Sequence, residues 1–156
     1  MQPPSVIPRP IVRGAAAILL RQKGPAHEAL LLRRRTAPFA GEWFPVEGRL
    51  RADEPPLAAI LREIREETGL VPLRLYRDVL EPQIVPSRGY DVHLSVFVGF
   101  VSANATVVLN HEHSHCEWLS LDAAITRVPL PAQRATLQRV QSVFVAVHPA
   151  ESLRVV

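Results

Sequence analysis

The sequence predicts a single α/β (α+β) domain in which a mixed β-sheet lies between helices. Its 156 residues, nearly half of them hydrophobic, suffice for one domain with a complete core. The hydrophobic pattern predicts strands, a helix, strands and a helix in that order, without an internal repeat. About twenty residues rich in proline and glycine separate the first strands from the first helix. A loop of that length in a compact domain is usually functional.

The domain is expected to lie between a flexible arm and a short tail. Four prolines and no hydrophobic periodicity in MQPPSVIPRP predict the arm over 1–10. The domain is expected over 11–150 and the tail over 151–156. The apolar runs GAAAILL and EALLLRRR flank a Gly-Pro turn signal, which predicts a β-hairpin or two neighbouring strands.

The segment TAPFAGEWFPVEGRLRADEP is expected to be the long loop, and the first helix begins where it ends. Pro55 and Pro56 suit the first turn of a helix, where the missing N–H has no partner in any case. Gly69 stands where a glycine cap ends a helix. The residues between these limits that recur at helical spacing, and so predict a stripe facing the core, are Leu57, Ile60, Leu61 and Ile64.

The second half is predicted to hold three strands and two helices. The strand-like runs are LRLYRDVLEP, YDVHLSVFVGFVS and ATVVLN, and the second alternates regularly from Tyr90 to Val98. A short helix is expected from SLDAAI. The segment PAQRATLQRVQSVFVAV starts at a proline and predicts a helix that buries Leu137, Val140, Phe144 and Val147.

Three glutamates crowd the C-terminal end of the first predicted helix, where negative charge is unfavourable. The helix dipole disfavours each exposed carboxylate there by about 0.3–1 kcal/mol. Glu63, Glu66 and Glu67 also repel one another, on a face away from the apolar stripe. Clustered oxygen ligands favour a hard divalent cation, Mg2+ or Mn2+. The alternative is a solvated face salt-bridged by Arg62 and Arg65.

The residues around these acids match a longer pattern. From Gly48 to Leu70, GRLRADEPPLAAILREIREETGL fits G-x5-E-x7-R-E-U-x-E-E-x-G-U at every fixed position, where U is a bulky apolar residue. This stretch resembles the signature of the Nudix hydrolases. The flanking segments LLLRRR, GEWFPVEG and HEHSHCEWLSLDAA are also similar to the family, though less specifically.

The resemblance implies the Nudix fold, an α/β/α sandwich around a mixed β-sheet, and a pyrophosphohydrolase acting on a nucleoside diphosphate linked to another group. It implies that Glu66 and Glu67 ligate the divalent metal and that Arg62 orients the carboxylates. Glu63 is then either a further ligand or the base that activates water. These roles suit the reaction, because a metal neutralises developing phosphate charge and lowers the pKa of a bound water.

Other signature positions are structural, and the segment before the signature departs from the family pattern. Glu54 is implied to pair with Arg62, and Gly48 and Gly69 are the fixed glycines. Many relatives place Pro-Gly-Gly where this chain has Pro-Val-Glu-Gly, ending at Gly48. The resemblance assigns a metal ligand to the backbone carbonyl of Glu47, and the Glu47 carboxylate is an alternative ligand.

The segment NHEHSHCEW predicts a crowded polar loop between strands. The resemblance places a catalytic or metal-binding glutamate here, at Glu112, so the general base is either Glu112 or Glu63. The histidines lack the spacing of a zinc site. We expect His111, His113 and His115 to face solvent, or to contact phosphates.

Candidate substrate-binding residues lie on both sides of the signature. Strand alternation in LLLRRR places Arg33 and Arg35 on one face and Arg34 on the other. One face is expected to contact phosphates, unless the strand simply ends in solvated charge. The aromatic residues that either stack on a base or join the core are Phe39, Trp43 and Tyr90.

The leading functional hypothesis is a hydrolase, dependent on Mg2+ or Mn2+, that splits a nucleoside triphosphate-like substrate into a monophosphate and pyrophosphate. The segments HEHSHCEWL and PAQRATL look most like Nudix enzymes for nucleoside triphosphates or dihydroneopterin triphosphate. The first alternative is hydrolysis of ADP-ribose or a nucleotide sugar. The second is a Nudix module that binds a nucleotide without turning it over.

Composition argues against several other classes of protein. A net charge of +3 with interspersed acids is too small to indicate nucleic-acid binding, although every basic residue except Lys23 is arginine. No apolar run approaches the ~20 residues of a membrane span. The single cysteine, Cys116, fits a reducing compartment, so we place the protein in the cytoplasm. The sequence locates no subunit interface, and a homodimer is an open alternative.

Overall fold

The computed structural model describes residues 1–2, 7–78, 83–87 and 89–156. Its strands are β1 (Ile11–Lys23), β2 (Ala26–Arg34), β3 (Trp43–Phe44), β4 (Val46–Arg49), β5 (Arg74–Arg77), β6 (Gln83–Pro86), β7 (Asp91–Phe100) and β8 (His113–Ser120). Its helices are α1 (Pro56–Thr68), α2 (Leu121–Arg127) and α3 (Pro131–Val140), with the π-helical turn η1 (Gln141–Val145) and the 3-10 turn η2 (Glu151–Leu153).

The strands form one mixed sheet built around β1. The order is β3-β2-β1-β7-β5, and in addition β4 pairs with β1, β6 with β7 and β8 with β2. β1 and β2 form the predicted antiparallel hairpin, with Leu20 opposite Ala29. β1 runs parallel to β7 but antiparallel to β4, where Ala15 lies opposite Gly48. The start of the signature is therefore anchored at the centre of the sheet.

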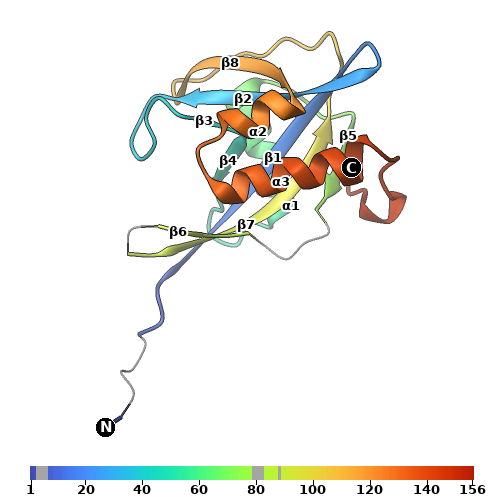
Figure 1. Ribbon diagram of the computed structural model, residues 1–156. Helices are drawn as coiled ribbons and strands as arrows, with labels where there is room; N and C mark the ends of the chain where they lie inside the picture. The colour runs from blue at the N-terminus through green and yellow to red at the C-terminus, as the bar shows by residue number, and fades with distance from the viewer. Residues whose placement is uncertain (3–6, 79–82, 88) are drawn as a thin grey trace.

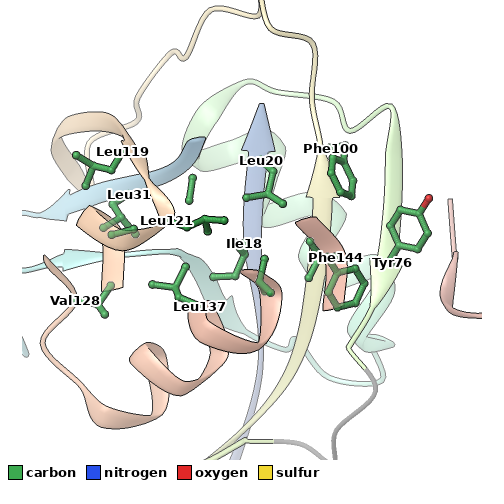
Figure 2. Packing of buried hydrophobic residues seen from close by; sticks show 14 residues of the cluster. Ile18, Leu20, Leu31, Tyr76, Phe100, Leu119, Leu121, Val128, Leu137 and Phe144 are labelled. Atoms are coloured by element: carbon green, nitrogen blue, oxygen red, sulfur yellow. The ribbon is translucent and has the colours of Figure 1, made fainter. Parts of the chain in front are cut away.

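Helices cover both faces of this sheet, which confirms the predicted α/β/α sandwich (Figure 1). Because side chains alternate along a strand, Ile18 and Leu20 of β1 pack with α2, α3 and η1 in one cluster (Figure 2). Ala17 and Leu19 belong to a second cluster on the opposite face, which packs against α1. The two separate cores hold the signature helix and the C-terminal helices on opposite sides of β1.

The first helix begins and ends as predicted. Pro55 is its N-cap and Pro56 its first residue, while Gly69 caps the C-terminus with a φ of 70°. At that φ a side chain would be strained, so the cap favours glycine. Ile60 and Ile64 of the predicted stripe are fully buried. Leu57 and Leu61 are partly buried against the same cluster.

Three predictions for the second half were wrong. ATVVLN forms no strand; Val107 and Leu109 pack against the core without a sheet partner, while Val108 is exposed. The predicted loop NHEHSHCEW instead contains most of strand β8, whose polar composition conceals its pairing along β2. Val147 is exposed because the chain leaves the helical path after η1. The short strands β3, β4 and β6 were not predicted, and the last four residues of LRLYRDVLEP lie outside the described residues.

Both ends of the chain contact the domain. Arg9 donates hydrogen bonds to Asp91 and to the carbonyl of Tyr90, both at 2.9 Å. At the other end, Arg154 forms a bridge with Tyr76 beside β5, although this segment was expected to be a simple tail. None of the helices in the described part of the chain is long and apolar enough to cross a membrane.

Candidate active site

Gly48 and Glu63 bring strand β4 and helix α1 into direct contact. A Cβ atom at residue 48 would lie 2.2 Å from the Glu63 carboxyl carbon, well inside van der Waals contact. The missing side chain therefore allows the Glu63 carboxylate to lie directly against the strand. Burial raises the pKa of Glu63 above its ordinary value, although Arg62 opposes this shift. The fixed glycine of the signature thus positions an acid of the helix.

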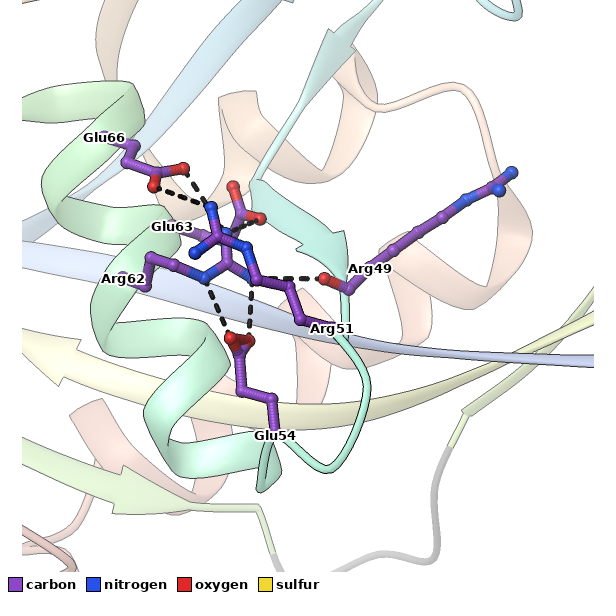
Figure 3. A network of polar contacts seen from close by, with 6 residues as sticks. All are labelled: Arg49, Arg51, Glu54, Arg62, Glu63 and Glu66. Carbon is purple, nitrogen blue, oxygen red and sulfur yellow. Dashed lines mark hydrogen bonds and ion pairs between the residues drawn. The ribbon is translucent and has the colours of Figure 1, made fainter.

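Arg62 joins the acids of α1 to the segment that precedes the helix (Figure 3). Its Nη2 and Nε atoms donate to the two oxygens of Glu54 at 2.7 and 3.0 Å, as the resemblance implied. Its Nη1 donates to Glu63 at 2.7 Å and to Glu66 at 3.3 Å. Nη2 also donates to the backbone carbonyl of Arg49 at 3.2 Å. One guanidinium therefore contacts three carboxylates and the end of β4.

Glu67 is buried, so the alternative of a solvated, salt-bridged face is wrong for this carboxylate. Only 1% of the residue is exposed, and no group in the described part of the chain hydrogen-bonds to its Oε2 atom. Burial, with the nearby charges of Glu63, Glu112 and Glu47, raises the pKa of Glu67 to about 9. A buried carboxylate oxygen without a partner is costly, and a cation at this point would relieve that cost.

Glu112, in the turn before β8, and His113, the first residue of β8, lie near Glu67. One ligand atom from each of Glu67, Glu112 and His113 lies within 4.8 Å of the other two. The expectation that His113 lies in a loop and faces solvent was wrong, because the residue begins β8 and only 4% of it is exposed. His111 and His115 are exposed, as expected.

Glu47 follows the buried Val46 in β4 and contributes to the same acidic region. It lines the adjoining cavity together with Arg34 and Glu112. Burial raises the pKa of the Glu47 carboxyl to about 7, and the charge of Arg34 only partly offsets this. The side chain that replaces a family glycine therefore adds an acid to the site.

A cavity of about 600 Å³ extends from the acids. Glu63, Glu112 and Arg34 line its acidic end, and the predicted aromatic candidates Phe39 and Tyr90 also line it. Arg49 lies over the Tyr90 ring at 5.7 Å. The combination of carboxylates, guanidinium groups and aromatic rings in one cavity suits a ligand that carries both phosphates and a ring.

Three predicted substrate-binding residues are not among those that line this cavity. Arg33 donates to the carbonyl of Gly41 at 3.1 Å, and Arg35 donates to the carbonyl of His113 at 3.3 Å. Trp43 packs against the core under α2, with Arg127 over its ring at 5.1 Å. A register shift between Arg33 and Arg34 interrupts the pairing of β2 with β8 at this point. Of the three consecutive arginines, only Arg34 lines the cavity.

Gln133 is a cavity residue that sequence reasoning missed. It stands in the first turn of α3, where its Oε1 atom accepts a hydrogen bond from the Leu130 N–H at 3.1 Å. Its buried Nε2 atom has no hydrogen-bond partner among the described residues. The available signal was a glutamine three residues after Leu130, in a helix begun by proline. That pattern is typical of a helix cap and does not reveal that the amide also faces a cavity.

A protein-family model and a characterised protein both match the sequence of this chain. A family model described as NUDIX domain matches residues 10–140. The octanoyltransferase of Myxococcus xanthus is 37% identical over 139 residues, which is 83% of this chain and 37% of that protein. The chain thus spans little more than a third of the length of this relative.

Two solved structures share most of the fold. The MutT protein from Methanosarcina mazei Go1 matches with a TM-score of 0.73 and 28% identity, over 87% of this chain and 96% of that one. A binary complex of the C. elegans Ap4A hydrolase matches with a TM-score of 0.75 and 22% identity, over 84% of this chain and 96% of that one. Both agree with the sandwich and strand pairing described above.

Proposed function

The chain belongs to the Nudix family, and from this premise we propose that it is a pyrophosphohydrolase, dependent on Mg2+ or Mn2+, for a nucleoside triphosphate-like substrate. The products are a nucleoside monophosphate and pyrophosphate. One observation carries the proposal: the buried oxygen of Glu67 has no partner among the described residues and lies near Glu112, which lines a cavity that also offers Arg34 and aromatic rings.

The acids at this site fit a divalent cation. Glu67 and Glu112 present oxygen atoms from two separate segments, α1 and the turn before β8. Glu66 lies beside Glu67 in α1, and Glu47 lies in β4. Carboxylate oxygens are the ligands that Mg2+ and Mn2+ prefer. When bound, such an ion supplies charge that stabilises the phosphates and lowers the pKa of a water molecule.

Glu63 is our candidate for the general base. Arg62 engages its Oε1 atom at 2.7 Å, which leaves Oε2 for a water molecule in the cavity. The contact with Gly48 holds the carboxylate in place. A base must lie within hydrogen-bond reach of the water it deprotonates, and Glu63 lines the cavity together with Glu47 and Glu112. Glu112 then serves as a ligand.

Arg34 and the far wall of the cavity are proposed to bind the substrate. The Arg34 Nε atom donates to the Pro38 carbonyl at 3.2 Å, so that its remaining N–H groups are available for phosphate oxygens. Phe39 and Tyr90 offer rings for stacking on a base. The free N–H of Gln133 suits a carbonyl or ring nitrogen on that base, because a buried donor favours a ligand with an acceptor.

The test is a panel of substrates: nucleoside triphosphates, dihydroneopterin triphosphate, ADP-ribose, a nucleotide sugar and dinucleoside polyphosphates. Phosphate-containing products are measured with Mg2+, with Mn2+ and with a chelator. We expect pyrophosphate from a triphosphate, and only when metal is present. Faster release from ADP-ribose or a nucleotide sugar would favour the first alternative. If no member of the panel is hydrolysed, the chain is a nucleotide-binding module.

Two variants test whether turnover depends on Glu66 and Glu67. Glu66→Gln with Glu67→Gln should abolish metal-dependent turnover while the fold is retained. Glu151→Gln, on an exposed residue of η2, is the control and should match the wild type. Unchanged turnover in the double variant would contradict the metal assignment.

A further inference from the structure

We infer that His113 is a nitrogen ligand of the metal centre, and that it makes the site prefer a first-row transition ion such as Mn2+ or Co2+ over Mg2+. This inference rests on the proposed function, because it assumes that the neighbouring carboxylates hold a divalent ion. It goes beyond that proposal by assigning a non-oxygen ligand to the centre and by predicting which ion the centre selects.

His113 lies close to the carboxylates of Glu67 and Glu112. A ring nitrogen of His113 and one oxygen each of Glu67 and Glu112 all lie within 4.8 Å of one another. Two ligands bound to one ion at about 2.1 Å lie at most about 4.2 Å apart. Three ligands on one ion lie about 3–4 Å from one another, so side-chain movements of about 1 Å would bring all three atoms onto one ion.

Two buried polar atoms from different segments also lack hydrogen-bond partners among the described residues. The Nδ1 atom of His113 and the Oε2 atom of Glu67 are both buried, and neither has a hydrogen-bond partner among the residues that the structure describes. They come from different elements, β8 and α1. Leaving one buried polar atom unpaired costs about 1–3 kcal/mol. An ion bound by these two atoms would give each of them a partner.

Hydrogen bonds hold the backbone of Glu112 and His113 in place. Arg35 donates from Nε to the His113 carbonyl at 3.3 Å and from its backbone N–H to the Glu112 carbonyl at 3.0 Å. The Asn110 side chain accepts from the Glu112 N–H at 3.1 Å. These contacts fix both backbone units while the two side chains remain available. Arg35 therefore positions the proposed ligands and does not itself reach the cavity.

The chemistry of the ligand set determines the selectivity. Mg2+ takes oxygen ligands and keeps several waters, whereas imidazole nitrogen favours first-row transition ions. For a site with mixed nitrogen and oxygen ligands, affinity rises from Mn2+ through Co2+. A single histidine among carboxylates should therefore increase the affinity for these ions while adding little for Mg2+.

The test measures metal binding directly and uses no substrate. Pulsed electron paramagnetic resonance of the Mn2+-loaded protein should detect a directly bound 14N nucleus, and calorimetry should show tighter binding of Mn2+ than of Mg2+. In His113→Gln the nitrogen signal should disappear and the Mn2+ affinity fall about 10- to 100-fold, by comparison with other metal-site residues. The Mg2+ affinity should change less than about threefold.

His115→Gln is the matched control, because His115 is an exposed histidine on the same strand. It should keep the nitrogen signal and both affinities. Mn2+ bound to the wild type without a nitrogen signal would overturn the role of His113 and leave the proposed function standing. Failure of the wild type to bind either ion would overturn both. Because the wild-type spectrum decides the question, the inference stays testable even if His113→Gln folds poorly.

Discussion

A Cβ atom at position 48 would lie 2.2 Å from an oxygen of the Glu63 carboxylate, so the glycine of β4 and the acid of α1 depend on each other. Gly48→Ala should displace Glu63 and lower kcat about 100-fold, the loss expected when a reacting group moves by about 1 Å. Steady-state kinetics on the best substrate of the panel checks this. The control is a double-mutant cycle: in a Glu63→Gln background the same alanine should have little further effect. If the alanine lowered kcat equally in both backgrounds, Gly48 would affect the reaction in some way other than by positioning Glu63.

Arg62→Lys tests whether the guanidinium fork organises the acids. A lysine has one donor centre and cannot contact Glu54, Glu63 and the Arg49 carbonyl together. We expect turnover to fall about 10- to 100-fold, as for residues that orient metal ligands. Arg65→Lys is the control, because Arg65 is an exposed arginine of the same helix. Full activity in Arg62→Lys would mean that the fork is not required.

The raised pKa of Glu67 predicts how the free energy of unfolding of the metal-free protein depends on pH. In the folded protein its carboxyl holds a proton up to a pKa of about 9, whereas the ordinary value of 4.5 applies when the chain unfolds. Between these values the folded state binds more protons, so the free energy of unfolding falls as the pH rises. The stability associated with the neutral carboxyl is fully present below 4.5 and has been lost above about 9.

Glu67→Gln should remove much of this dependence. Thermal unfolding in a chelator is measured from pH 5 to 9 for both proteins. The variant should be the more stable of the two at the alkaline end, because its amide carries no charge to desolvate. Added Mn2+ should stabilise the wild type and have little effect on the variant. A wild type whose stability rises over this pH range would show that Glu67 is not held neutral.

The sequence predicted those parts of the fold and site that depend on local pattern. Pro55, Pro56 and Gly69 mark the ends of α1, because proline and glycine act through the backbone of their own residues. The pairing of Arg62 with Glu54 also followed from the signature, since both positions are fixed within it. Each of these features depends on residues close together in the sequence, so it can be predicted without knowing the contacts between distant segments.

Features that depend on contacts between distant segments were not predictable in this way. His113 looked like part of a polar loop because β8 pairs by its backbone along β2 and needs no apolar side chain there. Helical periodicity placed Glu67 away from the apolar stripe, but it could not show that the residue is buried near Glu112 and His113. Strand alternation separated Arg34 from Arg33 and Arg35, but it could not show which of the two faces lines the cavity.

The Gln133 side chain allows a test of which nucleotide base the cavity prefers. Its Oε1 atom is held by the Leu130 N–H, so the amide is fixed with the Nε2 donor free and buried beside the cavity. Gln133→Glu keeps the acceptor for Leu130, but it replaces the Nε2 donor with a second carboxylate oxygen. It should raise KM about 10- to 200-fold for a base with a carbonyl at the contact point and change kcat little. For a base with an amino group there, KM should fall.

The comparison requires two triphosphates that differ at one exocyclic group, such as GTP and ATP, each assayed with the wild type and Gln133→Glu. Gln133→Leu is the second variant, and it should weaken both substrates because it also loses the bond to Leu130. Circular dichroism shows whether α3 remains folded in each variant. An equal change in KM for both nucleotides in Gln133→Glu would mean that Gln133 only caps α3 and does not read the base. A reversal of preference would identify it as the residue that selects the base.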